Sequence, residues 1–237
     1  MLFMNYGYSE LSPEASRLQL SAEDERNRQS IQLYHHVAGA IDWHGLDALE
    51  VSCGRGGGSS YIRRYFKPRS IIGIDITANA IDFCHRNYSI EGLSFMRGDA
   101  ESLQFAGNSV DVIVNIESSI CYPNVERFYD EVVRVLKPNG FFLYADLRQE
   151  DEIDTWRAQL RTTGLELLKE ENITPNVLEA LDRDNERKQK LIDQYVPKFL
   201  HKPFNEFAGM KGSEFFYGSL KNGNKRYMSF VLRKPIA

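Results

Sequence analysis

The sequence lacks the features that mark several common classes of protein. No window of its 237 residues approaches the ~20 uninterrupted apolar residues of a membrane span. The segment Met1 to Glu10 has neither a basic part nor an apolar part, so no secretory signal is expected and the default location is cytoplasmic. No block is rich in Lys and Arg, and 29 basic against 33 acidic residues give a formal charge of −4. Because contacts with a phosphate backbone need clustered positive charge, the composition argues against nucleic acid as a partner.

Cysteine is scarce as well. Cys53, Cys84 and Cys121 are the three cysteines of the chain, and they are widely spaced. Metal sites and disulfide frameworks need short paired spacings that are missing here. We therefore interpret the three as reduced thiols and predict no metal site.

The chain has an alternating pattern of short apolar runs and amphipathic segments. Strands are predicted at 46–51, 71–74, 93–96, 110–115 and 141–145. Helices are predicted at 14–40, 59–66, 77–88 and 125–136. Strands and helices at this spacing favour βαβ units and an open, doubly wound, mostly parallel α/β sheet of the Rossmann-like kind. A ligand should then lie outside the carboxyl ends of the strands.

The pattern changes after Asp146. A further helix is predicted at 149–163 and a strand at 165–170, whereas 174–208 reads as a charged and aromatic helical cap. The Asn222-Gly223 pair between the apolar runs 215–220 and 226–232 predicts an antiparallel hairpin at the sheet edge.

A glycine-rich turn follows the first predicted strand. Gly54 and Gly56 add no Cβ, so the backbone can approach a ligand closely where a helix begins. Asp75 lies 21 residues beyond Gly54, at the end of the next strand, where a carboxylate can accept both hydroxyls of a ribose. A ligand-free turn and a helix-start acid are the alternatives. These residues suit a nicotinamide dinucleotide or another adenosine cofactor, but a dinucleotide fold usually adds a second mononucleotide half, which the hairpin replaces here.

Five motifs in order resemble those of the class I S-adenosylmethionine-dependent methyltransferases. They are Leu49-Glu50-Val51-Ser52-Cys53-Gly54-Arg55-Gly56-Gly57-Gly58, Gly73-Ile74-Asp75-Ile76, Gly98-Asp99-Ala100, Val114-Asn115-Ile116-Glu117 and Leu136-Lys137-Pro138-Asn139-Gly140-Phe141. Three further segments are similar to the narrower group that methylates oxygens of polyketides, phenolic lipids and fatty acids: Met4-Asn5-Tyr6-Gly7-Tyr8, Gln32-Leu33-Tyr34 and Glu117-Ser118-Ser119-Ile120-Cys121-Tyr122-Pro123.

The resemblance implies S-adenosyl-L-methionine as the cofactor and assigns it a set of binding residues. They are Tyr34, Glu50, Ser52, Cys53, Gly54, Gly56, Asp75, Ile76, Asp99, Ala100, Glu101, Asn115, Ile116 and Glu117. Within this set Glu50 and the 52–56 turn would hold the methionine part, Asp75 the ribose, and Ile76 with Asp99 the adenine. Tyr34 and the 4–8 segment would cover the cofactor.

Two positions depart from the family pattern. Ser52 stands where the family usually has glycine, and Ile120 stands where the narrower group has a histidine that is a plausible proton acceptor. An alcohol acceptor needs its proton removed, whereas a carboxylate or phenolate needs much less help. Glu117, Asp146 and His36 are the candidate catalytic residues, with His35 as a further histidine of the same helix. Glu117 could instead position the cofactor, Asp146 could cap a helix, and either histidine could be a packed or solvated residue.

The cap carries seven aromatic residues that would either line an apolar acceptor pocket or pack as core: Tyr195, Phe199, Phe204, Phe207, Phe215, Phe216 and Tyr217. The charge run 183–190 reads as a solvated helix face.

We predict a single methyltransferase domain with a helical cover at 1–45, a cofactor core at 46–172, a cap at 173–212 and a hairpin at 213–237. Its function would be O-methylation of a small, largely apolar metabolite. Methylation of carbon or nitrogen on the same fold, or a cofactor-binding subunit without catalysis, are the alternatives. The sequence leaves the oligomeric state open.

Overall fold

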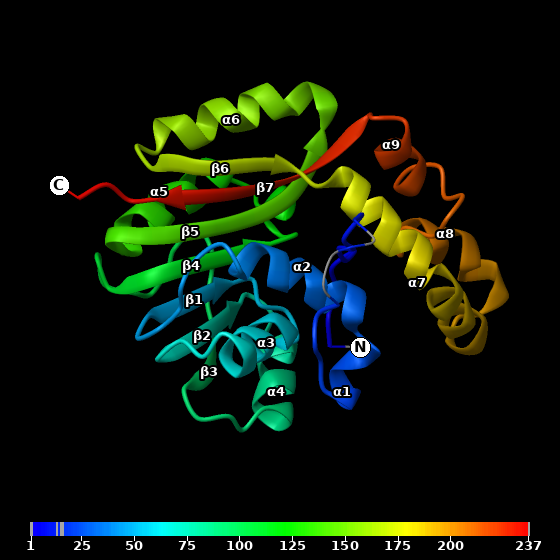
Figure 1. Cartoon of the computed structure of the whole chain (residues 1–237), viewed down its shortest axis with the longest axis horizontal. Coiled ribbons are helices and arrows are strands. Elements are labelled where there is room, and N and C mark those ends of the chain that lie inside the picture. The colour runs from blue at the N-terminus through cyan, green and yellow to red at the C-terminus, as the bar shows by residue number, and fades with distance from the viewer. Residues whose placement is uncertain (1, 13, 15–16, 237) are drawn as a thin grey trace.

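A computed structural model describes residues 2–12, 14 and 17–236 of the chain. The parts of the predicted cover, of the predicted helix 14–40 and of the C-terminal segment that fall on residues 1, 13, 15, 16 and 237 lie outside the described residues. The described chain forms an open sheet with helices on both faces and a helical projection at one end (Figure 1).

Seven strands form the sheet. They are β1 (Asp47–Val51), β2 (Ser70–Asp75), β3 (Leu93–Arg97), β4 (Val110–Ile116), β5 (Leu136–Gln149), β6 (Glu166–Asn172) and β7 (Lys225–Arg233). Their order is β3-β2-β1-β4-β5-β7-β6. Strands β1 to β5 pair in parallel, and β7 pairs antiparallel with β5 on one side and with β6 on the other. The predicted Rossmann-like fold class is confirmed.

The helices are α1 (Ala22–Glu25), α2 (Arg28–Ala38), α3 (Gly57–Tyr65), α4 (Ala78–Asn87), α5 (Val125–Val135), α6 (Ile153–Thr162), α7 (Thr174–Tyr195), α8 (His201–Phe207) and α9 (Tyr217–Lys221). Three 3-10 turns, η1 (Ser119–Cys121), η2 (Glu150–Glu152) and η3 (Lys198–Leu200), join some of them. Thr77, where the predicted helix 77–88 begins, is the N-cap residue of α4. The predicted helix over 14–40 is two helices, α1 and α2, with a turn between them.

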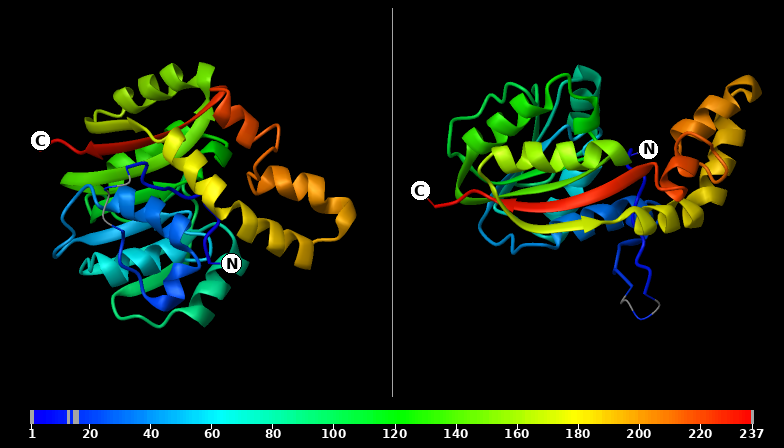
Figure 2. Two further views of the ribbon diagram at one scale, coloured as in Figure 1. Left: turned by 45° about the vertical axis from the view of Figure 1, so that its right-hand side comes forward. Right: turned by 90° about the horizontal axis from the view of Figure 1, so that it is seen from above.

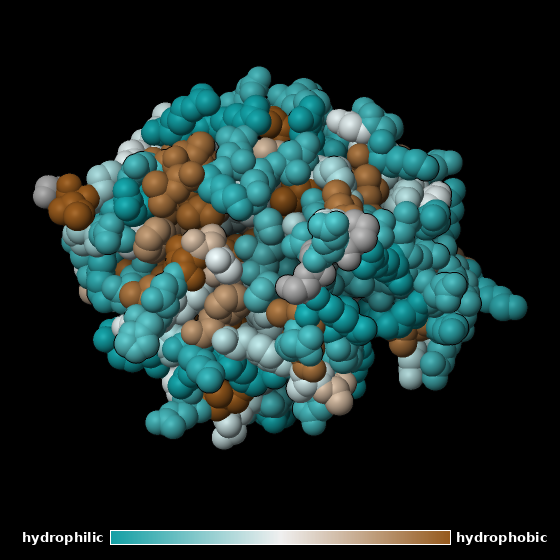
Figure 3. All heavy atoms as spheres, viewed as in Figure 1, coloured by the Kyte–Doolittle hydropathy of each residue, from teal (hydrophilic) through white to brown (hydrophobic). Residues whose placement is uncertain are grey.

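Two apolar cores lie on opposite faces of the sheet. One joins α2, α3, α7 and α9 to sheet residues such as Val112 and Leu143. The other joins α5 and α6 to the alternate residues, among them Ile113 and Phe142. Because side chains along a strand alternate between faces, consecutive apolar residues of one strand fill both cores. On the face seen in Figure 1, the apolar surface gathers over β4 to β7 (Figure 3).

The predicted hairpin at 215–232 is wrong. Residues 217–221 are the helix α9, and β7 alone enters the sheet, between β5 and β6. The Asn-Gly pair does make a tight turn, with Gly223 at φ +84°, but this turn links a helix to a strand. Strand β7 lies inside the sheet because β5, which continues to Gln149, pairs with it over nine residues.

The cap, α7 to α8, leaves the body of the protein as a helical arm. Helix α7 packs on the sheet at its start, where Val177 and Leu181 are buried, and then projects away with α8 folded back along it (Figure 2).

Candidate functional site

The turn between β1 and α3 forms one wall of the site. Ser52, Gly54 and Gly56 all have positive φ values, of +61°, +52° and +73°. The backbone therefore leaves β1 in a sharp curve that directs N–H groups and the start of α3 outward. A Cβ on Gly58 would come within 2.0 Å of the Tyr34 ring, so glycine is required at that position. The Ser52 hydroxyl turns to the Tyr122 hydroxyl, 2.6 Å away, which accommodates the departure from glycine.

Asp75 ends β2 beside this turn. One of its carboxylate oxygens accepts the Gly54 N–H at 3.0 Å, and the other accepts the Thr77 N–H at 2.9 Å. Each oxygen retains a further lone pair, and the side chain is partly exposed to the cavity described below. The carboxylate can therefore accept two hydroxyl donors from a ligand.

A second acidic segment follows β3. The Asp99 carboxylate accepts the Glu101 N–H at 2.9 Å, and the Glu101 carboxylate accepts the Asn124 N–H at 2.7 Å. Ile76, 61 % exposed, faces the same space from the end of β2. An apolar face with acceptors at its rim suits an aromatic amine such as adenine.

Glu117 follows β4 with a φ of +52°, a conformation that non-glycine residues rarely adopt. Its Oε1 accepts the Tyr6 N–H and the Tyr227 hydroxyl, each at 2.8 Å. Burial raises the pKa of this carboxyl to about 8. Among the described residues its Oε2 has no hydrogen-bond partner.

A cavity of about 490 Å³ unites these groups at the carboxyl ends of β1, β2 and β4. The following predicted cofactor residues line it: Tyr34, Ser52, Cys53, Gly54, Asp75, Ile76, Asp99, Ala100, Glu101, Ile116 and Glu117. Residues 2–5 and 121–123 close its sides. Its size is that of a site for a small organic molecule.

Three predicted cofactor residues lie behind the cavity wall. Glu50 is buried, its carboxylate accepts the Tyr34 and Ser59 hydroxyls, and burial raises its pKa to about 7. The Asn115 amide donates to the Val51 carbonyl at 3.1 Å and to the Tyr122 hydroxyl at 2.9 Å. A Cβ on Gly56 would clash with Phe95 and Cys84. These residues support the wall of the cavity and do not line it.

Two predicted catalytic residues do not line the cavity. Asp146 is fully buried and accepts the Ser119 hydroxyl at 2.6 Å, the Ile120 N–H at 3.1 Å and the Leu147 N–H at 2.8 Å. It therefore anchors the loop after β4. It caps no helix either, because Gln149 and Glu152 form the capping box at η2.

His36 does not line the cavity either. It lies 3.2 Å from Glu171 and stacks on Tyr8 at 4.4 Å, outside the cavity. His35 donates to or accepts from the Tyr61 hydroxyl. His36 is partly buried and His35 is exposed, which fits the alternative of a packed or a solvated residue.

Three tyrosines support the site through contacts that the sequence did not predict, although Tyr6 lies in the 4–8 segment expected to cover the cofactor. The Tyr122 hydroxyl contacts Ser52, Asn115 and Ser118, which ties the β1 turn to the end of β4. Tyr227, on β7, reaches Glu117 across the sheet. The backbone N–H of Tyr6 holds Glu117, while its ring stacks on Phe216 at 3.8 Å. Tyr6 and Tyr122 stand in segments that resemble the narrower group, whereas Tyr227 is brought to the site by the insertion of β7 into the sheet.

None of the seven cap aromatics lines the cavity. Phe216 and Tyr217 pack in the core, so core packing is right for these two alone. The other five are 44–82 % exposed.

Comparison with known proteins agrees with this geometry. Residues 49–144 match the model of a methyltransferase domain family. A phthiotriol/phenolphthiotriol dimycocerosates methyltransferase of Mycobacterium tuberculosis is 41 % identical over 234 residues, which are 99 % of this chain and 86 % of the relative. A fatty-acid O-methyltransferase of Mycolicibacterium smegmatis is 36 % identical over 235 residues, 99 % and 84 % of the two chains. A crystal structure of a putative sarcosine dimethylglycine methyltransferase from Galdieria sulphuraria shares the fold, with a TM-score of 0.79 at 14 % identity, over 98 % of this chain and 93 % of that one.

The sheet is parallel where it forms the cavity, its first turn is rich in glycine, and its second strand ends in an acidic residue. Together these features define an enzyme that binds a nucleoside cofactor. The chain belongs to the S-adenosylmethionine-dependent methyltransferases, in the group of the mycobacterial phthiotriol dimycocerosate and fatty-acid O-methyltransferases. The predicted activity, O-methyl transfer with S-adenosylmethionine as cofactor, is confirmed.

The described residues contain no helix long and apolar enough to cross a membrane. They also contain no group of three or more His, Cys, Asp or Glu placed to hold a metal ion.

Proposed function

We propose that this chain methylates an oxygen at the polar end of a long-chain lipid. The observation that carries the proposal is similarity over nearly the whole chain to two relatives named for lipid acceptors. The similarity includes the cap, so it extends beyond the cofactor half that all such enzymes share. The sequence predicts a small, largely apolar acceptor, and a long-chain lipid is a more specific proposal within that class.

The cofactor would bind along the cavity in an extended form. The 52–56 turn would hold the methionine part, the Asp75 carboxylate the ribose hydroxyls, and Ile76 with Asp99 and Ala100 the adenine. These residues fit the group because all except Gly56 face the cavity, where they offer hydrogen-bonding groups or apolar surface. When bound, S-adenosylmethionine supplies an electrophilic methyl group on sulfur.

Glu117 would take the proton from a hydroxyl acceptor. It is the one predicted catalytic residue that lines the cavity, and its Oε2 is available. A carboxyl group with a pKa near the working pH suits a general base. The positive φ of Glu117 and the hydrogen bonds from Tyr6 and Tyr227 hold the carboxylate in one orientation, so little ordering remains for the reaction. This role also explains how the enzyme works with Ile120 in place of the expected histidine.

A lipid carboxylate is the second candidate acceptor. It is supported by the fatty-acid O-methyltransferase relative and by Lys188, a partly buried cation of the cap. The Lys188 ammonium donates to the Ala208 carbonyl at 3.0 Å and lies close enough to Glu117 for each charge to affect the pKa of the other group. The prediction that the charge run 183–190 is a solvated helix face is therefore wrong at Lys188. A carboxylate acceptor needs no base, so the two candidates differ in their need for Glu117.

The domain division is part of the proposal. The core 46–172 would hold the cofactor, while the segment 1–45, the cap 173–212 and the C-terminal 213–237 would hold the acceptor. A cytoplasmic location remains a prediction, in keeping with the free thiols of Cys53 and Cys84.

Replacement of Glu117 tests the acceptor. With a long-chain alcohol, Glu117→Gln should lower kcat about 10²- to 10⁴-fold. With a fatty acid, it should leave kcat within a few-fold. Wild-type kcat on the alcohol should rise with pH through about 8, because the base must be deprotonated, and the variant should lose this rise.

Binding of S-adenosylhomocysteine, measured by calorimetry, should be unchanged in the variant and so exclude misfolding. Glu91→Gln, at an exposed position between α4 and β3, is a matched control. Full alcohol turnover by Glu117→Gln would refute the role as base. Failure of both lipids as acceptors for the wild type would refute the proposed function.

A further inference from the structure

The part of the cap from the end of α7 to the end of α8 exposes an unusual density of aromatic rings. Phe199 is 82 % exposed, Phe207 73 % and Tyr195 71 %, and Phe204 of α8 is 44 % exposed. All four lie within the 13 residues 195–207. A soluble surface exposes single large apolar residues often, but seldom four rings in so short a segment.

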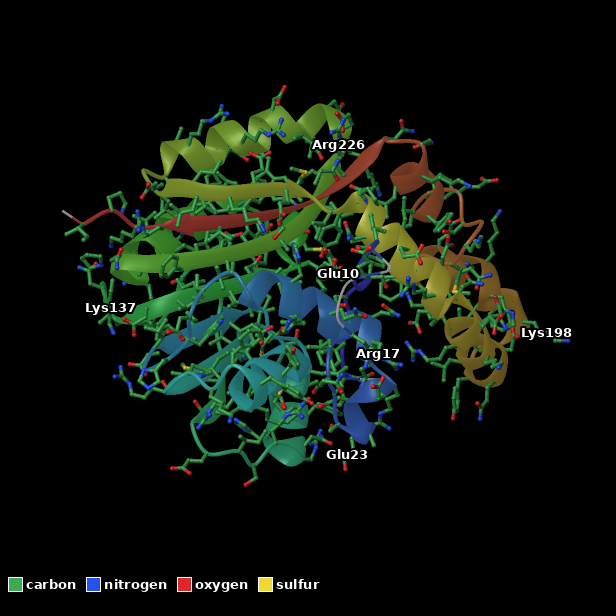
Figure 4. The ribbon with its side chains drawn as sticks, in the orientation of Figure 1. Glu10, Arg17, Glu23, Lys137, Lys198 and Arg226 are labelled. Atoms are coloured by element: carbon green, nitrogen blue, oxygen red, sulfur yellow. The ribbon has the colours of Figure 1, made fainter. Side chains whose placement is uncertain are left out.

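The charged residues in the outer part of the same segment are all basic. Lys198 and Lys202 are exposed, and no acidic residue occurs between Asp193 and Glu206. Figure 4 shows Lys198 at the outermost end of the cap, directed away from the protein. The acidic residues that balance the rest of α7, such as Glu179 and Asp184, pair with arginines nearer the body.

The segment is connected to the reaction site. At the end of α8, the Phe207 carbonyl accepts the Tyr6 hydroxyl at 3.3 Å, and the Tyr6 backbone N–H holds Glu117. Phe207 of this segment is thus linked through Tyr6 to Glu117, whose carboxyl group faces the cavity. The rings contribute nothing to the cavity wall and little to the core, so neither role accounts for them.

We propose that residues 195–207, the cap tip, dock the enzyme on an anionic lipid surface from which it takes its acceptor. This rests on the proposed function, because a long-chain lipid is held in a membrane or aggregate. Aromatic rings insert at the level of the headgroups, and lysines beside them are attracted to anionic lipids. The arm seen in Figure 2 would let the tip reach the lipid surface while the cofactor half remains in water.

Co-sedimentation with vesicles tests the proposal without turnover. Vesicles of phosphatidylcholine with 30 mol % phosphatidylglycerol should bind the wild type at least about tenfold more tightly than pure phosphatidylcholine vesicles, and added salt should weaken binding. The double variant Phe199→Ser/Phe207→Ser should lose at least about tenfold in affinity for both vesicles. Lys198→Glu/Lys202→Glu should lose the preference for anionic vesicles.

Matched controls separate these effects from general ones. Leu167→Ser/Leu168→Ser removes two exposed apolar residues, 44 % and 43 % exposed, from the edge strand β6. Lys190→Glu/Lys221→Glu makes the same change in net charge at exposed positions outside the tip. Both should bind vesicles like the wild type.

Two results would overturn the docking role. One is equal vesicle binding by the wild type and the Phe199→Ser/Phe207→Ser variant. The other is a wild-type dimer in light scattering that this variant disrupts, without vesicle binding, since the rings would then cover a second copy of the chain. Turnover of a short, water-soluble alcohol tests the proposed function separately, because the tip variants should leave it unchanged.

Discussion

The carboxyl ends of the strands, here called the cofactor edge, and the cap differ in how firmly their side chains are held. At the edge, Asp75 and Glu117 each accept two hydrogen bonds from groups close by, so the residues at the strand ends are fixed by their surroundings. In the cap, Phe199 and Phe207 contact mostly water. The difference teaches that an acidic residue such as Asp75, held by the turn beside it, can be placed from local sequence, whereas the role of an apolar side chain depends on which distant segments pack against it.

The largest effect on stability is expected at the edge. Asp146→Ala removes the acceptor for the Ser119 hydroxyl and the Ile120 N–H and leaves the neighbouring Arg148 guanidinium buried, 3.4 Å from where the carboxylate was. An unpaired buried charge costs about 3–5 kcal/mol. Urea unfolding should show this loss, with Asp130→Ala on the exposed side of α5 as control. A loss below about 1 kcal/mol would mean that the edge is no more rigidly built than the cap.

Asp75→Ala should affect ligand binding most. At about 1.5–3 kcal/mol for each hydrogen bond to a charged group, two lost bonds weaken S-adenosylhomocysteine binding at least about 100-fold. Calorimetry measures the change, and Asp82→Ala on the exposed face of α4 should bind like the wild type. Unchanged affinity in Asp75→Ala would place the ribose elsewhere.

The smallest effect is expected in the cap. Phe199→Ala should change the free energy of unfolding by no more than about 0.5 kcal/mol, because the ring is 82 % exposed. A loss of 2 kcal/mol or more in urea unfolding would show that the ring is packed in solution, and the contrast between the two regions would disappear.

Most of the cofactor edge could be predicted because its signals are local. The strand runs, the glycine turn and Asp75 lie within a few residues of the structure they specify, and the predicted strands β1 to β4 agree with the structure to within a residue or two. The position of Asp146 shows the limit of such signals. A carboxylate within a strand near its carboxyl end can face the cavity or the core, and the difference is decided by which face of β5 packs under the loop at Ser119.

The errors in the C-terminal third come from contacts between distant segments. An Asn-Gly turn signals a change of direction but not which strand is paired, so the sequence predicts a strand where α9 forms. The exposed rings of the cap were predicted to be covered because aromatics usually are. Tyr6 and Tyr227 reach Glu117 over 111 and 110 residues of sequence, and no spacing rule connects positions so far apart.

The place of β7 in the sheet has a consequence for synthesis of the protein. Strand β6 has β7 as its partner in the sheet, and β7 leaves the ribosome more than fifty residues later. During that interval the long edge of β5 and the apolar pair Leu167 and Leu168 have no strand beside them. The nascent chain is then most prone to aggregation. The pairing of β7 with β5 and β6 ends this period, and it also brings Tyr227 to Glu117.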